Sequence, residues 1–324
     1  MARESDIFLN DFFVYCESKN LSRKTIKSYD QTLRLFFIYL ENEHNITDVR
    51  NTKSTHVRQY IKHLKERGKY TVVGNEGSQQ INFPDHRTDH GKQIGDTTIA
   101  NYLRNIKVFF NFLKEEGEIR EAPTKRIENI KPKRRKKPLL SKHDLQQVLR
   151  QFDITIFHEY RTYMQMRLIL DTGLRAGECC ALIPADIDFR TKSMLVRNPK
   201  NHMERYVYFS HKLSRELKRW MMYRDRFSDS DFLFPTIRGT QLDVRNFEKS
   251  IRKAGIKAGV EIHPHQLRNN FAKYYLLAGG DFASLSRILG HSSIEVTQQA
   301  YLDFTDEEVG RKYQRHSPLN HLDI

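Results

Sequence analysis

Arginine, histidine, lysine and tyrosine side chains recur in the second half of the chain in an arrangement suited to phosphoryl transfer. This chemistry needs cations for the phosphate oxygens, an acid for the leaving oxygen and a base for the nucleophile. Without a metal ion, arginine is the best phosphate clamp, because its planar guanidinium matches two phosphate oxygens. The candidate residues are, in chain order, Arg175, Glu178, Lys200, His265, Arg268, His291 and Tyr301.

The local sequence favours a functional position for several of these residues. In TGLRAGE, Arg175 follows a glycine turn and stands beside a predicted helix N-terminus, whose N–H groups favour an anion. His265 and Arg268 are at i and i+3, so they share one helix face. Lys200 lies at the tip of a predicted hairpin, where a flexible side chain can reach a bound substrate.

Taken singly, each candidate has a plainer structural explanation. An arginine after a glycine turn is usually a surface cation, and a hairpin lysine is usually solvated. An H-x-x-R pair is more often a surface patch, and a tyrosine on a short helix usually packs in a core. Only the order and spacing of the whole set favour a catalytic interpretation.

That order resembles the tyrosine recombinase (phage-integrase) family. Four segments carry the resemblance: TGLRAGE followed by CCAL, VRNPKNHMERYVYF, HPHQLRNNFA and LGHSSIEVTQQAY. Two further segments, LSRKTIKSYDQTLRLFFIYL and TTIANYLRNIKVFFNFL, resemble the family's core-binding domain. The resemblance spans nearly the whole chain. With no arm-binding domain expected before the first helix, it implies a simple recombinase of the Xer or transposon-integrase kind.

The resemblance implies a role for each candidate in phosphate binding. Arg175 and Arg268 would bind the non-bridging oxygens of the scissile phosphate, and His291 would hydrogen-bond a phosphate oxygen. Glu178 would orient His265 without touching the DNA.

It also implies the roles in bond making and proton transfer. Tyr301 would attack the phosphate and leave a 3′-phosphotyrosine and a free 5′ hydroxyl. His265 would accept or return the tyrosine proton, and Lys200 would protonate the leaving 5′ oxygen. The phosphodiester energy is kept, so rejoining needs no ATP.

Three positions depart from the family pattern. Asn269 follows the second arginine, where a histidine is common, and His291 and Tyr301 are ten residues apart, where nine is frequent. The tip around Lys200 lacks the usual glycines, which leaves Lys192 and Arg205 as alternatives for the acid. Tyr313 is the alternative nucleophile.

The elements that must position these residues are mainly helical. In the first third, apolar residues recur every three or four positions, which predicts four amphipathic helices. These helices begin near Phe8, Ser22, Thr55 and Asp96. Because four such helices can bury one another's apolar faces, we expect a helical domain over residues 1–120 with its aromatic side chains in the core. Residues 69–95 have no helical period, and a short hairpin over 70–73 and 80–83 is one option.

The second half combines helices with one hairpin. Residues 189–197 and 205–209 alternate apolar and polar side chains, which predicts two paired strands. Helix starts are indicated by capping-box pairs, Ser141 with Asp144 and Ser292 with Glu295. The predicted fold class is therefore mainly α with a small antiparallel β-sheet.

We expect two domains that form a clamp on DNA: a helical core-binding (SAM-like) domain over 1–120 and an α+β catalytic domain over 141–324. Residues 121–140 form the linker between them, and Pro132 and Pro138 discourage a helix there. The linker either follows DNA phosphates or is a solvated connection. Its cations are Lys131, Lys133, Arg134, Arg135, Lys136 and Lys137.

Composition is consistent with a nucleic-acid partner. The 324 residues carry a formal net charge of +15, which suits a polyanion. Three cysteines, with no C-x-x-C pair, predict neither a disulfide framework nor a zinc site, and we expect no metal or other cofactor. No apolar run approaches the ~18 residues of a membrane span, and the N-terminus lacks a signal-peptide layout. These features predict a cytoplasmic protein with no membrane association.

The expected partner is double-stranded DNA with paired inverted binding sites. In the family, tails such as Leu302–Ile324 pack on a neighbouring subunit, which implies a homo-tetramer on DNA. The predicted activity is site-specific recombination, in the integration, excision or resolution of a mobile element. Two alternatives stay open: a type IB topoisomerase-like enzyme that relaxes DNA, and a catalytically silent DNA-binding protein.

Overall fold

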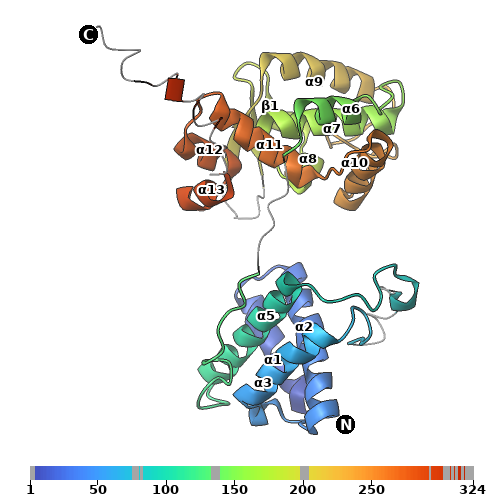
Figure 1. Ribbon diagram of the computed structural model, residues 1–324. Helices are drawn as coiled ribbons and strands as arrows, with labels where there is room; N and C mark the ends of the chain where they lie inside the picture. Colours follow the sequence, from blue (N-terminus) through green and yellow to red (C-terminus); the bar gives the residue numbers. More distant parts are fainter. Residues whose placement is uncertain are drawn as a thin grey trace. The chain divides into compact units, whose positions relative to one another are not determined.

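The computed structural model describes residues 4–74, 80, 83–132, 139–197, 204–291 and 293–301, and in the tail residues 307, 310, 313, 314 and 317. The chain forms two compact units, Met1–Arg135 and Lys136–Ile324 (Figure 1). The division falls within the predicted linker, residues 121–140, and the bounds of that linker stay a prediction.

The N-terminal unit is helical, as predicted. Its helices are α1 (Glu4–Ser18), α2 (Arg23–His44), α3 (Ser54–Glu66) and α5 (Asp96–Glu115), with single 3-10 turns η1 (Val49–Asn51) and η2 (Pro84–His86). α2 begins where the Ser22 hydroxyl accepts a hydrogen bond from the Thr25 N–H at 3.2 Å. It ends at Asn45, which adopts a left-handed conformation with φ 54°.

Aromatic side chains contribute to the core of this unit together with aliphatic ones. Phe12, Phe36, Phe109 and Phe110 are fully buried, and the rings of Phe12 and Phe109 meet edge to face with centroids 5.4 Å apart. The prediction that these aromatic residues are core, rather than a base-stacking surface, is confirmed.

The segment between α3 and α5 is closed at its base. An antiparallel bridge joins Gly68 to Gln93, and the Lys69 N–H donates to the Lys92 carbonyl at 2.8 Å. The Arg87 guanidinium lies over the Tyr70 ring at 4.1 Å. The hairpin considered over 70–73 and 80–83 lies partly outside the described residues, since 81 and 82 are among those not described.

The C-terminal unit surrounds a small sheet with helices (Figure 1). Its helices are α6 (Lys142–Leu149), α7 (Phe157–Thr172), α8 (Ala176–Ala181), η3 (Pro184–Asp186), α9 (His211–Arg224), α10 (Val244–Ala258), α11 (Pro264–Leu277), α12 (Phe282–Leu289) and α13 (Ile294–Tyr301). The predicted capping box starts α6, because Ser141 Oγ accepts from the Asp144 N–H at 3.1 Å and the Asp144 carboxylate accepts in return. The second predicted box includes Ser292, which lies outside the described residues.

The sheet is antiparallel in the order β1 (Ile187–Asp188), β2 (Ser193–Val196), β3 (Arg205–Tyr208). β2 and β3 pair from Ser193 opposite Tyr208 to Val196 opposite Arg205, so Arg205 stands at the end of the ladder nearest the hairpin tip. Met194, Val196 and Val207 are buried in the core of the unit. The predicted fold class, mainly α with a small antiparallel sheet, is confirmed. Among the described residues, no helix is both long and apolar enough to cross a membrane.

Candidate active site

Arg175 occupies the junction between α7 and α8. α7 ends at Gly173, whose φ of 70° is left-handed, and a side chain there would clash with the Phe271 ring. The turn places Arg175 at the N-cap of α8. There the Glu178 carboxylate accepts from the Arg175 backbone N–H and from Nη1, each at 2.8 Å. The helix start therefore fixes both the backbone and the guanidinium of Arg175.

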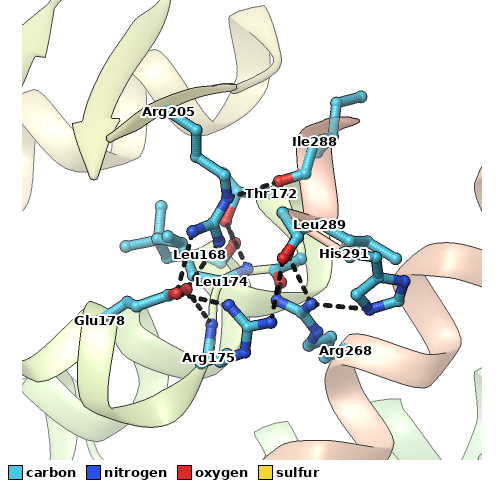
Figure 2. Close-up of polar contacts among 12 residues, drawn as sticks. Leu168, Thr172, Leu174, Arg175, Glu178, Arg205, Arg268, Ile288, Leu289 and His291 are labelled. Carbon is cyan, nitrogen blue, oxygen red and sulfur yellow. Dashed lines mark hydrogen bonds and ion pairs between the residues drawn. The ribbon is translucent and has the colours of Figure 1, made fainter. Parts of the chain in front are cut away.

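Glu178 is shared between two arginines. Besides Arg175, it binds Arg205 through both carboxylate oxygens, at 2.9 Å to Nη1 and 2.8 Å to Nη2 (Figure 2). Burial alone would raise the pKa of Glu178. The hydrogen bonds and charge of Arg205, together with the hydrogen bonds from Arg175, instead lower it to about 2. Glu178 is therefore ionised at neutral pH.

Glu178 was expected to orient His265. In the described part of the chain, its carboxylate binds the guanidinium groups of Arg175 and Arg205. Each guanidinium brings a full positive charge, which favours these strong hydrogen bonds. A role of Glu178 toward His265 stays a prediction.

Arg268 is buried within the same group of residues. Its side chain leaves α11, and the residue is 3% exposed. Nη1 donates to the Gly173 carbonyl at 2.7 Å. Nη2 donates to the Leu289 carbonyl at 2.8 Å (Figure 2). These bonds connect α11 to the turn before Arg175 and to the end of α12.

His291 lies in contact with Arg268, just after α12. Its Nε2 is 3.2 Å from Arg268 Nη2, and its Nδ1 is 2.7 Å from the Thr297 hydroxyl on α13. Burial, followed by the positive charges of Arg268, Arg175 and Arg205, lowers the pKa of His291 to about 4. The ring is therefore neutral at neutral pH. A guanidinium can only donate, so Nε2 accepts from Arg268 and Nδ1 carries the proton.

His265 stands one helical turn before Arg268 on α11. The residue is exposed, yet partial burial and the charges of Arg268 and Arg175 lower the pKa of its imidazole. It therefore lies within the field of the two arginines, in the neutral form that can accept a proton.

Two candidates are described incompletely. Tyr301 is the last residue of α13, the helix that also carries Thr297, and its side chain lies outside the described part. Lys200 lies outside the described residues as well, within 198–203, the stretch between β2 and β3. Of the basic linker residues only Lys131 is described, and it is exposed; Lys133, Arg134, Arg135, Lys136 and Lys137 lie outside.

Both alternatives to Lys200 as the general acid, Lys192 and Arg205, lie among the residues that the structure describes. Lys192 precedes Ser193, which pairs with Tyr208 at the end of the ladder away from the hairpin tip. It is therefore separated from Arg205 by the length of β2, roughly 13 Å at ~3.3 Å per residue. Arg205 is at the end of the ladder nearest the hairpin tip, but its guanidinium is bound by Glu178. It entered the sequence argument only as a substitute for Lys200, and its bonds to Glu178 were missed.

Asn270 is a second residue that the sequence argument missed. It is fully buried on α11, two residues after Arg268, and binds both backbone groups of Leu140. The H-P-H-Q-L-R-N-N-F-A motif contained it, but nothing in the motif indicates its partner 130 residues away.

The chain resembles known proteins along most of its length. Residues 138–308 match the model of the phage integrase family, and residues 9–73 match the phage integrase N-terminal SAM-like domain. Among curated relatives, the tyrosine recombinase XerC of Oceanobacillus iheyensis is 25% identical over 97% of this chain and 96% of its own length. The tyrosine recombinase XerC of Bacillus subtilis is 27% identical over 88% of this chain and 96% of its own length.

Solved structures share the fold. The Tn1549 transposon integrase in complex with transposon right end DNA aligns with a TM-score of 0.72 and 18% identity, over 98% of this chain and 100% of that one. A lambda integrase dimer bound to a core site aligns with a TM-score of 0.67 and 14% identity, over 91% and 94% of the two chains.

Proposed function

This chain belongs to the phage integrase family and is a site-specific tyrosine recombinase, and from that premise we propose how its residues cut and rejoin DNA. One observation carries the proposal: Arg175, Arg268 and His291 come together from three separate segments. Arg268 contacts His291 directly, and Arg175 Nη2 lies 3.4 Å from the Gly290 carbonyl beside it. Two guanidiniums and an imidazole in one place form a receptor for a phosphate group.

The chemical step follows from this receptor. The Tyr301 hydroxyl attacks the phosphorus and forms a phosphotyrosyl bond to the 3′ side, while the bond from phosphorus to the 5′ oxygen breaks. His265 takes the phenol proton, and Lys200 gives a proton to the leaving 5′ oxygen. Arg175, Arg268 and His291 hold the charge that builds on the non-bridging oxygens. Attack by another 5′ hydroxyl reverses these steps and joins a new strand.

The substrate and assembly are proposed from the same premise. We infer double-stranded DNA with paired inverted sites, held in a clamp by the two domains, with a homo-tetramer as the active assembly. The Tn1549 integrase structures contain transposon DNA, which supports integration or excision of a mobile element, including transposition. Localisation in the cytoplasm is part of the same proposal, since the proposed substrate is DNA.

The nucleophile gives the most direct test. Tyr301→Phe removes only one oxygen, so DNA binding should stay near the wild-type level while covalent attachment is lost. The measurement is trapping of protein on a nicked DNA site, resolved by denaturing gel. Tyr313→Phe is the matched control and should still form the adduct. An adduct in the Tyr301 variant that disappears in the double variant would assign the reaction to Tyr313.

The same assay distinguishes the topoisomerase-like alternative. A recombinase with a specific site should relax supercoiled plasmid only when the plasmid carries that site. Relaxation of site-free plasmid at the same rate would favour the type IB topoisomerase-like enzyme. A silent DNA-binding protein would form no adduct on any substrate.

A further inference from the structure

Arg205 makes a set of contacts that the proposed chemistry does not use. Its side chain is 8% exposed, and it leaves β3 at the end of the ladder nearest the hairpin tip. Nη1 and Nη2 bind the two oxygens of Glu178, and Nε donates to the Ile288 carbonyl at 2.8 Å (Figure 2). Three of its five N–H groups are thus engaged by two elements far apart in sequence.

The first of these contacts acts on Arg175. Glu178 is 6% exposed in its side chain and binds the Arg175 guanidinium as well as Arg205. With Arg205 present, the Glu178 carboxylate is shared between two guanidinium groups. The three side chains together therefore keep a net positive charge that can attract the phosphate. Without Arg205, the charge of Glu178 would be opposed by Arg175 alone. The carboxylate would then hold that guanidinium back from the DNA.

The second contact acts on the segment that leads to His291. Ile288 is near the end of α12, three residues before His291, and Gly290 follows with a left-handed φ of 62°. A Cβ atom on Gly290 would lie 2.8 Å from Arg205 Cδ and 3.0 Å from Nε, so the backbone packs directly on this guanidinium. The position of the His291 imidazole therefore depends on the Arg205 side chain, against which the backbone before His291 packs.

We propose that Arg205 is a positioning residue that aligns Arg175 and the His291 segment for the same phosphate. This proposal rests on the recombinase activity proposed above, and it assigns Arg205 no proton transfer. An arginine is a poor acid because its guanidinium stays protonated in proteins, and this one is buried against a carboxylate. Its role differs from that of Lys200, the proposed acid.

The two roles separate when the leaving group is changed. The probe is a nicked DNA site in which sulfur replaces the bridging 5′ oxygen at the scissile phosphate. A thiolate leaves without a proton, because thiols are far more acidic than alcohols, with a pKa of about 8.5. A variant that lacks the general acid should therefore cleave the sulfur substrate well. A variant that lacks a positioning residue should stay slow on it.

Arg205→Met should slow cleavage by roughly 100-fold on the oxygen substrate, the scale expected when reacting groups are misplaced by about 1 Å. The loss should be the same on the sulfur substrate, while Lys200→Ala should regain most of its rate there. DNA affinity measured in parallel should stay within a few-fold of the wild type. If sulfur restores cleavage by Arg205→Met, Arg205 is the acid and the positioning role is overturned.

A second variant separates positioning from general structural damage. In Glu178→Gln/Arg205→Met the uncompensated carboxylate is gone, so cleavage should be faster than in Arg205→Met alone. A double variant whose loss equals the product of the two single losses would overturn the proposed coupling through Glu178.

Arg205→Lys serves if the methionine variant does not fold. Its single ammonium keeps a charge opposite Glu178 but cannot bind both carboxylate oxygens and the Ile288 carbonyl together. Cleavage should fall equally on both substrates, with binding retained; wild-type cleavage by this variant would overturn the proposal. Failure of the proposed function itself would be seen separately, either as wild-type protein that forms no adduct or as an adduct that does not depend on Tyr301.

Discussion

At the scale of single residues, His291 shows how charge sets the protonation state before DNA binds. Burial and the charges of three arginines lower its pKa. Arg268 donates to Nε2, so the Nδ1–H faces the Thr297 hydroxyl. A phosphate oxygen can only accept. To hydrogen-bond it through Nε2, the ring must either move its proton to Nε2 or take up a second one. The arriving phosphate favours the second proton because its negative charge offsets the arginines.

The depressed pKa of His291 predicts a pH dependence of stability. The pKa is about 4 in the folded protein and 6.5 in the unfolded chain, so the unfolded state binds more protons between these values. Stability should therefore fall as the pH drops from 6.5 to 4. Glutamine does not titrate, so His291→Gln should not lose this stability. The unfolding free energy of the variant minus that of the wild type should therefore increase by on the order of 2 kcal/mol as the pH falls from 6.5 to 4.

The measurement can be confined to the catalytic unit. Trp220 is the single tryptophan of the chain and is fully buried in that unit, so its fluorescence follows unfolding there. His211→Gln, on the exposed start of α9, is the matched control and should track the wild type. A constant difference between wild type and His291→Gln from pH 6.5 to 4 would contradict the lowered pKa.

The sequence could predict some of these residues and not others. The motifs around Arg175, Arg268 and His291 contain their own positioning signals: a glycine turn, a helix face and a helix end. Tertiary structure then brings the three together. The bonds between Glu178 and Arg205 were not predicted, because they join residues 27 positions apart, one on β3 and one on α8. No local pattern encodes such a tertiary contact.

At the scale of elements, the start of the catalytic unit is fastened to its central helix. The Leu140 N–H donates to Asn270 Oδ1 at 3.2 Å, and Asn270 Nδ2 donates to the Leu140 carbonyl at 2.6 Å. Asn270 is on α11, two residues after Arg268, and both partners are buried. The chain that leaves the linker is therefore tied to the helix that carries one of the phosphate-binding arginines.

Asn270→Ala should destabilise the catalytic unit. The substitution leaves the Leu140 N–H and carbonyl buried without partners, which should lower the unfolding free energy by about 2 to 3 kcal/mol. Trp220 fluorescence during denaturant unfolding measures this change. Asn246→Ala, at an exposed position of α10, is the matched control and should change stability by less than about 0.5 kcal/mol. Equal stabilities of the two variants would show that Asn270 does not hold the segment.

Elements with a strong period were the easiest to predict. α2 and α5 follow the three-and-four spacing of apolar side chains, and α6 begins at its predicted capping box. The segment between α3 and α5 was harder, because its order comes from the Gly68–Gln93 bridge and from stacking of Arg87 on Tyr70. These contacts join residues 25 and 17 positions apart, beyond the reach of a periodic pattern.

At the scale of the whole molecule, two units with separate cores are joined by a strongly basic stretch. One core combines aromatic and aliphatic side chains of α1, α2, α3 and α5, and the other includes side chains of α7 and the sheet. Such units fold around their own interiors, so the linker cations are not needed for either core. The linker cations are therefore available to bind a partner molecule, and we propose that they bind DNA phosphates.

The linker cations should contribute affinity without sequence preference. Changing Lys133, Arg135 and Lys137 to Ala should weaken binding to specific and non-specific DNA by similar factors, because phosphate contacts carry no base information. Each lost contact should also reduce the slope of log affinity against log salt by roughly 0.9. Cleavage at saturating protein should change little, since none of the three belongs to the proposed site. Arg134→Lys/Arg135→Lys keeps the charges and is the control, for which the slope should stay at its wild-type value. A triple variant that binds with the wild-type salt slope would identify the stretch as a solvated linker, with the phosphates bound elsewhere on the molecule.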